Sequence, residues 1–126
     1  MTPEAELLEV SLKLLKAIDA GDWKTYASLC DEDITCFEPE ANGHLVAGLP
    51  FHKYYFDLPG NGTPKLSSAA SPNIRVIGDV GIVCYARLVQ KLDASGAPVT
   101  ATADETRIWQ KVGGVWKHIH FHRSPV

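Results

Sequence analysis

The chain has 126 residues, 45% of them hydrophobic and 21% charged, which is enough to form one domain, residues 1–126, without metal or disulfide support. Its net charge of −3 argues against nucleic-acid or anionic-membrane partners, since either needs a basic patch. No run approaches the ~20 apolar residues that span a bilayer, and no secretory signal begins the chain. Three cysteines without CxxC or CxxH spacing indicate reduced thiols, so we expect a cytoplasmic protein.

The first 30 residues predict two helices. Thr2, Pro3 and Glu4 supply a capping hydroxyl, a proline for the first turn and an acid near the positive end of the helix dipole. Apolar residues then recur every three or four positions, which predicts one face of an amphipathic helix: Leu7, Leu8, Leu12, Leu15 and Ile18. Gly21 should end this helix, and Asp22 should cap a second, shorter one.

The middle of the chain predicts short elements. Residues 34–37 favour a brief strand, and another brief strand should precede Gly48. The segment LPFHKYYFDL (residues 49–58) favours a short helix, because its aromatic residues recur at spacings of three and four rather than two. The segment PGNGTP (residues 59–64) predicts a loop, with too few glycines for a phosphate-binding site.

Long strands dominate the second half. They are predicted at residues 65–77, 80–92 and 98–111, and a final hairpin turns at Gly113-Gly114. Two helices, a short helix and a long antiparallel meander predict an α+β fold. We expect the N-terminal helices to pack on one face of a curved, mostly antiparallel sheet.

Three of these strands each place an arginine among apolar residues. Residues two apart in a strand share a face, which pairs every arginine with an aromatic residue: Arg87 with Tyr85, Arg107 with Trp109, and Arg123 with Phe121. A buried guanidinium needs an anionic partner. That partner is either internal, with Glu105 the nearest candidate, or a bound carboxylate or phosphate. One acid for three arginines favours an anion pocket over purely structural ion pairs.

The opposite face of the same strands is apolar. If the first helix covers the arginine face, this second face is left exposed as an association surface. Its predicted members are Ile82, Cys84, Ala86, Leu88 and Ile108.

The last strand repeats histidine at every second position. By alternation, Trp116, His118, His120 and His122 should share one face. A His-x-His pair can bind zinc, but no third ligand is visible and Trp116 indicates packing. We therefore expect these histidines at a subunit contact and predict no metal site.

Acid–base catalysis is the alternative function. His52 lies close to Asp57 in the sequence, and Glu38 and Glu40 bracket a proline. One such group tuned toward neutral pH would suffice for catalysis. An enzyme would need a carboxylate or imidazole that no arginine neutralises, and no nucleophile–base motif or glycine elbow occurs.

Four blocks of sequence carry a resemblance to a known family: AIDAGDWKTYASLCD, FEPEANGHLVAGLPFHKYYF, YARLVQKLDASGAP and DETRIWQKVGGVWKHIHFHRS. The chain closely resembles, over essentially its whole length, the association (hub) domain of calcium/calmodulin-dependent protein kinase II. The resemblance implies the conical fold shared with nuclear transport factor 2 (NTF2), ketosteroid isomerase and SnoaL-like proteins. It also implies a non-catalytic domain that assembles into rings and has a deep pocket for small carboxylates.

The resemblance implies that the pocket is lined by the same arginines that strand alternation places on one face. Arg87, Arg107 and Arg123 would supply charge, with Glu105 among them, and His52 matches the family's histidine. The apolar wall would be Tyr85, Trp109 and Phe121.

The chain also departs from the family's pattern. No kinase domain or calmodulin-binding segment precedes Met1, so kinase activity is not carried over, and a free-standing, bacterial-type copy or a piece of a longer chain is expected. Residues 57–71 keep little of the family's sequence, and Val99 stands where the family has a basic residue. We therefore expect dimerisation through the sheet and assign no ring size.

We thus predict a homo-oligomeric, NTF2-like domain that binds a small organic anion, with no cofactor and no catalytic residue. The alternative is a SnoaL-like or ketosteroid-isomerase-like isomerase, dehydratase or hydrolase with His52 or a pocket carboxylate as base. A pure scaffold would instead pair all three arginines with protein acids.

Overall fold

The computed structural model describes residues 1–59 and 64–126, so most of the predicted loop at 59–64 lies outside the described residues. The elements are, in chain order, α1 (Pro3–Ala20), α2 (Trp23–Leu29), β1 (Cys30–Phe37), the 3-10 helix η1 (Pro39–Ala41), β2 (Val46–Ala47), α3 (Pro50–Asp57), β3 (Leu66–Ile77), β4 (Val80–Leu92), β5 (Pro98–Val112) and β6 (Val115–Pro125). The strands form one sheet in the order β2-β1-β6-β5-β4-β3.

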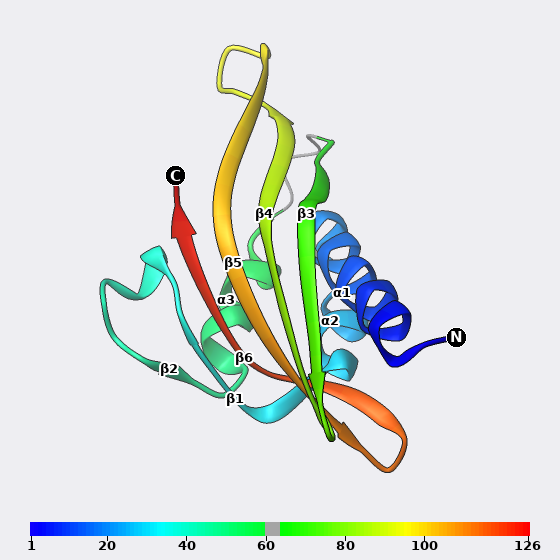
Figure 1. Cartoon of the computed structure of the whole chain (residues 1–126). Helices are drawn as coiled ribbons and strands as arrows, with labels where there is room; N and C mark the ends of the chain where they lie inside the picture. Colours follow the sequence, from blue (N-terminus) through cyan, green and yellow to red (C-terminus); the bar gives the residue numbers. More distant parts are fainter. Residues whose placement is uncertain (60–63) are drawn as a thin grey trace.

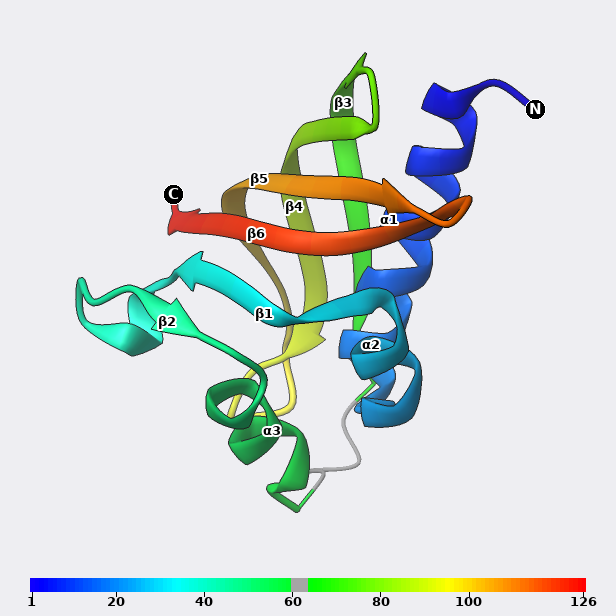
Figure 2. The same cartoon turned by 90° about the horizontal axis from the view of Figure 1, so that it is seen from below.

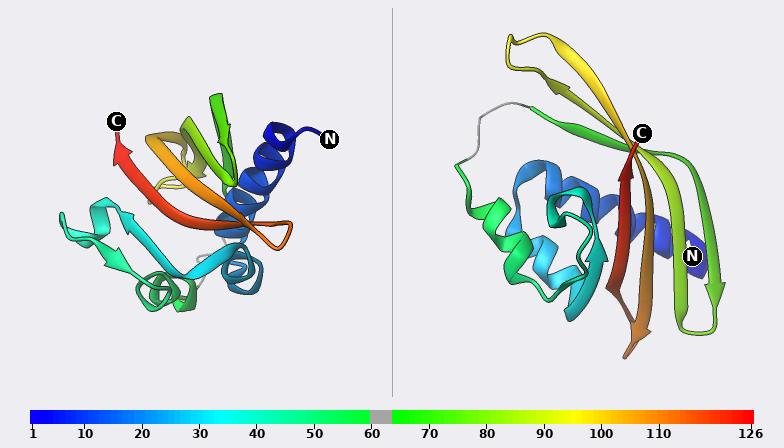
Figure 3. Two further views of the ribbon diagram at one scale, coloured as in Figure 1. Left: turned by 60° about the horizontal axis from the view of Figure 1, so that its bottom comes forward. Right: turned by 90° about the vertical axis from the view of Figure 1, so that its left-hand side faces the viewer.

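The sheet is mixed and strongly curved. Its neighbouring strands run antiparallel except β1 and β6, which pair in parallel. Figure 1 shows α1, α2 and α3 behind the sheet, and Figure 2 shows β6 and β1 crossing the direction of β3 steeply. In both views of Figure 3 the helices lie on the concave side and leave the other face uncovered. The predicted α+β arrangement, helices packed on a curved and mostly antiparallel sheet, is confirmed.

The predicted helix boundaries are confirmed by their caps. Thr2 Oγ1 accepts a hydrogen bond from the Ala5 amide at 3.1 Å, which satisfies one free donor of the first turn of α1. Gly21 ends α1 in the left-handed region, at φ 66°, a conformation that glycine adopts without steric cost. Asp22 then caps α2 by accepting from the Thr25 amide at 3.1 Å.

The short elements follow the prediction with one difference in length. The predicted short helix is α3, and the brief strand before Gly48 is β2. However, β1 begins at Cys30 rather than at residue 34. Its first half is rich in acids and carries no strand pattern of its own, but Cys30 pairs with His118 of β6, a contact distant in the chain.

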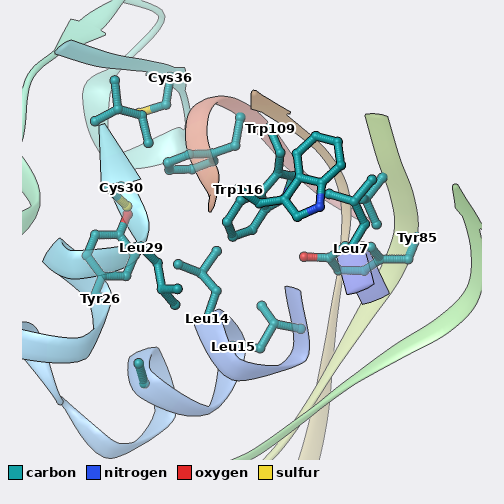
Figure 4. Packing of buried hydrophobic residues seen from close by; sticks show 14 of the residues in the cluster. Leu7, Leu14, Leu15, Tyr26, Leu29, Cys30, Cys36, Tyr85, Trp109 and Trp116 are labelled. Atoms are coloured by element: carbon teal, nitrogen blue, oxygen red, sulfur yellow. The ribbon is translucent and has the colours of Figure 1, made fainter. Parts of the chain in front are cut away.

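The core lies between α1 and the concave face of the sheet. Leu7, Leu14 and Leu15 of α1 are almost completely buried and point toward Trp109 and Trp116 (Figure 4). Leu12, which the sequence placed on the apolar stripe, is 45% exposed. The helical period carries it round the axis away from Leu7, and Ser11 takes the buried position instead. In the described part of the chain, none of the helices is both long enough and apolar enough to cross a membrane.

A β-bulge in β6 corrects the predicted faces of the last strand. Ile108 is opposite His120, but Trp109 is opposite His118, so Ile119 is an extra residue without a partner. The extra residue reverses the alternation. His118 therefore faces the core and is 0% exposed, while His120 points to the opposite face. The prediction that Trp116, His118, His120 and His122 share one face is wrong, and His118 is not available for a subunit contact.

The close approach of α1 to β4 gives a test of this packing. A Cβ at Gly81 would lie 2.3 Å from Leu7 Cδ1, and the backbone at Gly81 is outside the left-handed region, so the constraint is steric. We expect Gly81→Ala to lower the free energy of unfolding by about 1–3 kcal/mol through overpacking. In a Leu7→Ala background the same change should cost much less, because the clash is gone. Chemical denaturation of the four proteins of this cycle measures the coupling, and strictly additive costs would contradict the contact.

Candidate functional site

A cavity of about 460 Å³ lies on the concave face of the sheet, between the end of α1 and α3. Three adjacent strands contribute one arginine each: Arg87 from β4, Arg107 from β5 and Arg123 from β6. His52 of α3 lines the same cavity. The structure thus brings the three predicted arginines and the predicted histidine to one place. Apolar and aromatic side chains complete the wall, among them Tyr26, Tyr55, Phe56, Val89 and Phe121.

A single buried carboxylate organises two of the arginines. Glu105 is 2% exposed, and its Oε1 accepts from Arg107 Nη2 at 3.0 Å and from the Tyr85 hydroxyl at 2.7 Å. Its Oε2 accepts from Arg87 Nη1 at 3.3 Å. Arg107 Nε also donates to the Tyr85 hydroxyl, at 2.8 Å, and the Arg107 guanidinium lies 4.5 Å from the centre of the Phe121 ring. Glu105 is therefore shared by both guanidinium groups.

Burial and charge act in opposite directions on this network. Burial by itself would raise the pKa of Glu105, but the neighbouring Arg107 and Arg87 and the Tyr85 hydrogen bond hold that pKa below its ordinary value. Burial likewise favours neutral Arg107, yet Glu105 and Tyr85 raise its pKa, so the guanidinium stays charged. For His118, burial comes first and nearby Arg107 second, and both lower the pKa, so the imidazole is neutral in the core.

Arg87 and Arg123 also contact acids that lie outside the long strands. Arg87 Nη2 lies 3.5 Å from Asp19 Oδ1, at the end of α1, and Asp19 also accepts from Ser67. Arg123 Nη2 contacts both carboxylate oxygens of Glu40 and lies 3.8 Å from Glu38 Oε2. Every one of the three arginines thus has an acidic partner, as the scaffold hypothesis requires.

The hydrogen-bond donors of these arginines are nevertheless not all paired with an acceptor. Arg107 Nη1 is buried and has no hydrogen-bond partner among the described residues. The cavity wall also carries two lysines, Lys65 and Lys91, so its five cations exceed its three acids, Asp19, Glu38 and Glu40, by two charges. Counting Glu105 behind the wall leaves an excess of one (5 − 4 = 1). The site remains electropositive.

Some predicted wall residues lie elsewhere. Of the three predicted aromatic residues, Phe121 lines the cavity, whereas Tyr85 and Trp109 are buried in the core behind it. Glu105 also lies behind the wall, where it pairs with arginines instead of facing a ligand. Alternation places residues on a face, but the position along the curved sheet decides which of them reach the cavity.

The sequence missed the acids and lysines of the wall. Asp19 sits at the end of a helix and carries no pattern that links it to Arg87. Glu38 and Glu40 are candidate acid–base groups in the sequence, but no pattern there links them to Arg123. His52 was considered beside Asp57, but its Nε2 lies 3.0 Å from Glu38 Oε1, while Asp57 pairs with Lys53 at 2.6 Å.

The candidate acid–base groups are all engaged. Glu38 contacts both His52 and Arg123, so it does not meet the condition of a base that no arginine neutralises. Cys36 Sγ lies 3.5 Å from His52 Nε2. Burial, followed by the nearby Glu38 carboxylate, raises the pKa of the Cys36 thiol to about 12. Cys36, Glu38 and His52 together could hold a metal ion.

The predicted association surface lies on the uncovered, convex face of the sheet. Its half-buried members are Ile82, Cys84, Ala86, Leu88 and Ile108. The bulge adds His120 and His122 to this face, where both rings contact Phe37 of β1 at centroid distances of 6.1 and 5.6 Å. The outer face across β4, β5, β6 and β1 therefore combines these apolar and imidazole groups with polar residues of β5, among them Thr106 and the exposed Asp104, which is opposite Ala86.

The shared carboxylate predicts a pH-dependent stability. Because the pKa of Glu105 is lowered by folding, its stabilising effect should be complete above about pH 4.5, its ordinary pKa, and be lost as the pH falls through the lowered value. Glu105→Gln should cost about 3–5 kcal/mol near neutral pH, since it leaves two buried guanidinium groups short of an anion. The difference from the natural chain should shrink in acid, as measured by chemical denaturation at several pH values.

Glu40→Gln is the matched control for this prediction. Glu40 pairs with Arg123 at the more exposed end of the cavity, where an ion pair contributes about 0–1 kcal/mol. Equal costs for the two glutamate variants, or a cost for Glu105→Gln that does not change with pH, would contradict the assigned role of Glu105.

Comparison with known proteins accounts for this architecture. The family described as "Calcium/calmodulin dependent protein kinase II association domain" matches residues 3–126. The calcium/calmodulin-dependent protein kinase type II subunit delta of Oryctolagus cuniculus is 40% identical over 122 residues, which cover 94% of this chain and 23% of that protein. The chain therefore spans less than a quarter of the length of this relative.

Solved structures agree with the match. The CaMKII (calcium/calmodulin-dependent protein kinase II) hub homology domain of Chlamydamonas reinhardtii is 49% identical, with a TM-score of 0.95 over 100% of this chain and 99% of that one. An NTF2-like protein from Cytophaga hutchinsonii has the same fold, with a TM-score of 0.81 at 20% identity and full coverage of both chains. The fold is thus NTF2-like, as predicted, and the chain belongs to the calcium/calmodulin-dependent protein kinase II association-domain family.

Proposed function

We propose that residues 1–126 act as one self-association domain, in which the convex face of the sheet binds a second copy of the chain. The observation that carries the proposal is the uncovered apolar outer face, in a chain whose relatives are described as association or hub domains. Patches of this kind mark association surfaces in soluble proteins. The three free cysteines support a cytoplasmic setting, where thiols stay reduced.

The composition of the outer face favours a second copy over an unrelated partner. Small and branched side chains of β4 and β5 lie close together there, and a symmetric pair would place each apolar residue against the same surface of its partner. Near its centre Cys84 lies 3.6 Å from the Thr106 hydroxyl, and the same face carries the exposed Asp104, opposite Ala86, and the exposed Arg75, opposite Ile82. Apolar side chains together with polar groups are the usual composition of an interface between identical copies.

Leu88→Asp should reduce the mass of the particle in solution. The new carboxylate would lie within the apolar contact, where burial of an unpaired charge is costly. Sedimentation or light scattering should show a shift to smaller species, with an unchanged circular dichroism spectrum. Leu12→Asp is the matched control, because Leu12 is also an exposed leucine but lies on α1. A Leu88→Asp protein that keeps its full mass would contradict this interface.

The cavity is the second part of the proposed function. We propose that it binds a small carboxylate with a short apolar tail. Support comes from the excess of cations on its wall, the aromatic side chains beside them, and Arg107 Nη1, which has no partner in residues 1–59 and 64–126. Against it stands the pairing of every arginine with an acid, so a ligand would have to compete with Glu40 for Arg123 or share the existing partners.

Butyrate and butyramide distinguish charge recognition from simple filling of the cavity. Both have the same shape, and only butyrate should bind in isothermal titration. Arg123→Gln should weaken butyrate binding by more than about tenfold, because a charge-assisted hydrogen bond contributes about 1.5–3 kcal/mol. Arg75→Gln, an exposed arginine on the outer face of β3, should leave binding unchanged. Equal binding of the amide, or no binding of either compound, would contradict an anion site.

A further inference from the structure

A cluster of side chains beside the cavity contains more metal-binding atoms than its hydrogen bonds require. Cys36 in β1, Glu38 just after β1 and His52 in α3 bring a sulfur, a carboxylate oxygen and an imidazole nitrogen within 4.8 Å of one another. Cys36 is 0% exposed, and the side chains of His52 and Glu38 are 9% and 8% exposed. Three different ligand types therefore meet in a buried place, from two separate segments.

The separations suit a tetrahedral ion. Zinc binds sulfur at about 2.3 Å and imidazole nitrogen at about 2.0–2.1 Å, which places two such ligands about 3.5 Å apart at a tetrahedral angle. Cys36 Sγ and His52 Nε2 are 3.5 Å apart. The His52 Nε2 to Glu38 Oε1 distance is 3.0 Å, against about 3.4 Å for a tetrahedral nitrogen–oxygen pair. The third pair, Cys36 Sγ and the Glu38 carboxylate, lies within 4.8 Å.

Hydrogen bonding alone leaves part of the cluster unexplained. His52 Nε2 carries at most one hydrogen, which cannot be donated well to Glu38 and to Cys36 together. On the other side of the ring, Nδ1 is buried without a partner in the described part of the chain. The imidazole is therefore fixed by its packing between Phe51, Phe121 and Tyr26, whose ring centres lie 5.4–6.2 Å away. A rigid imidazole beside a thiol and a carboxylate is arranged as a ligand set.

The charges also match a divalent ion. A Cys36 thiolate and the Glu38 carboxylate would together neutralise a 2+ ion at this buried position. Two guanidinium groups, those of Arg107 and Arg123, are close enough to act on Cys36. That of Arg123 lies 3.8 Å from Glu38 Oε2, while Oε1 is the oxygen that faces His52. Glu40 holds the same guanidinium from its other side. Arg123 can thus support the bound carboxylate without occupying the oxygen that the ion needs.

We propose that Cys36, Glu38 and His52 form a site for a divalent transition-metal ion, with zinc the best match to this mixture of sulfur, nitrogen and oxygen ligands. The Cys36 thiol releases its proton to solvent as the sulfur binds the ion. Three protein ligands leave a fourth position, and because Glu38 and His52 line the cavity, water fills that position from the cavity side. Support for this site does not come from the proposed carboxylate binding, although both lie at the same cavity.

Cobalt is the probe, because its absorption reports the ligands. Titration of the reduced full chain with Co²⁺, without any carboxylate present, should produce a near-ultraviolet thiolate-to-metal band and the strong visible bands of a tetrahedral ion. Both should saturate at one equivalent per chain, and Zn²⁺ should abolish them by displacement. Cys36→Ser should remove the near-ultraviolet band and weaken metal binding by at least about tenfold, since loss of a mere supporting group costs about 10–100-fold.

Cys30→Ser is the matched control. Cys30 is the other buried thiol that contacts an imidazole, with its sulfur 3.6 Å from His118 Nδ1, and it lies in the core rather than beside the cavity. Its variant should keep the full cobalt spectrum. Glu38→Gln gives a second test at the cavity wall, away from the core, and it should retain the thiolate band with weaker binding.

Three results would overturn the site. They are the absence of a thiolate band in the natural chain, a band that survives Cys36→Ser, and a band that disappears with Cys30→Ser. Since no carboxylate is present in these titrations, each result leaves the butyrate measurement unaffected, and failure of one proposal does not imply failure of the other.

Discussion

A buried carboxylate on the concave face of the sheet is the constraint around which this molecule is arranged. Glu105 can remain charged there only because Arg107, Arg87 and the Tyr85 hydroxyl surround it. These contacts come from two neighbouring strands held in fixed register, with Tyr85 opposite Glu105. The network therefore links the pairing of β4 and β5 to the charge of the cavity. A change in register would separate the ions and leave each of them buried alone.

The helix α1 closes this arrangement on one side. Its leucines cover the tryptophans of β5 and β6, and its last turn brings Asp19 to Arg87 and to the start of β3. The cavity thus begins where the apolar packing of α1 ends. The same curvature that leaves a cavity inside leaves an apolar convex face outside.

The two faces of one sheet therefore carry two separate properties. The concave face holds ion pairs, a cavity and the ligand set proposed around His52, while the convex face holds the surface proposed for self-association. Alternation along β4 separates them residue by residue, with Arg87 inside and Leu88 outside. Such a division lets substitutions on one face leave the other face intact.

The sequence by itself determined the local elements and the faces of the regular strands. Caps at Thr2 and Asp22 and the period-two pattern of β4 and β5 depend on neighbours in the chain, so α1, α2 and the inward arginines were predictable. The tertiary structure decided the rest. The bulge at Ile119, the contact of Asp19 with Arg87, and the meeting of Cys36 with His52 all join segments far apart in sequence. No local pattern encodes such contacts, because they exist only once the sheet has curved around the helices.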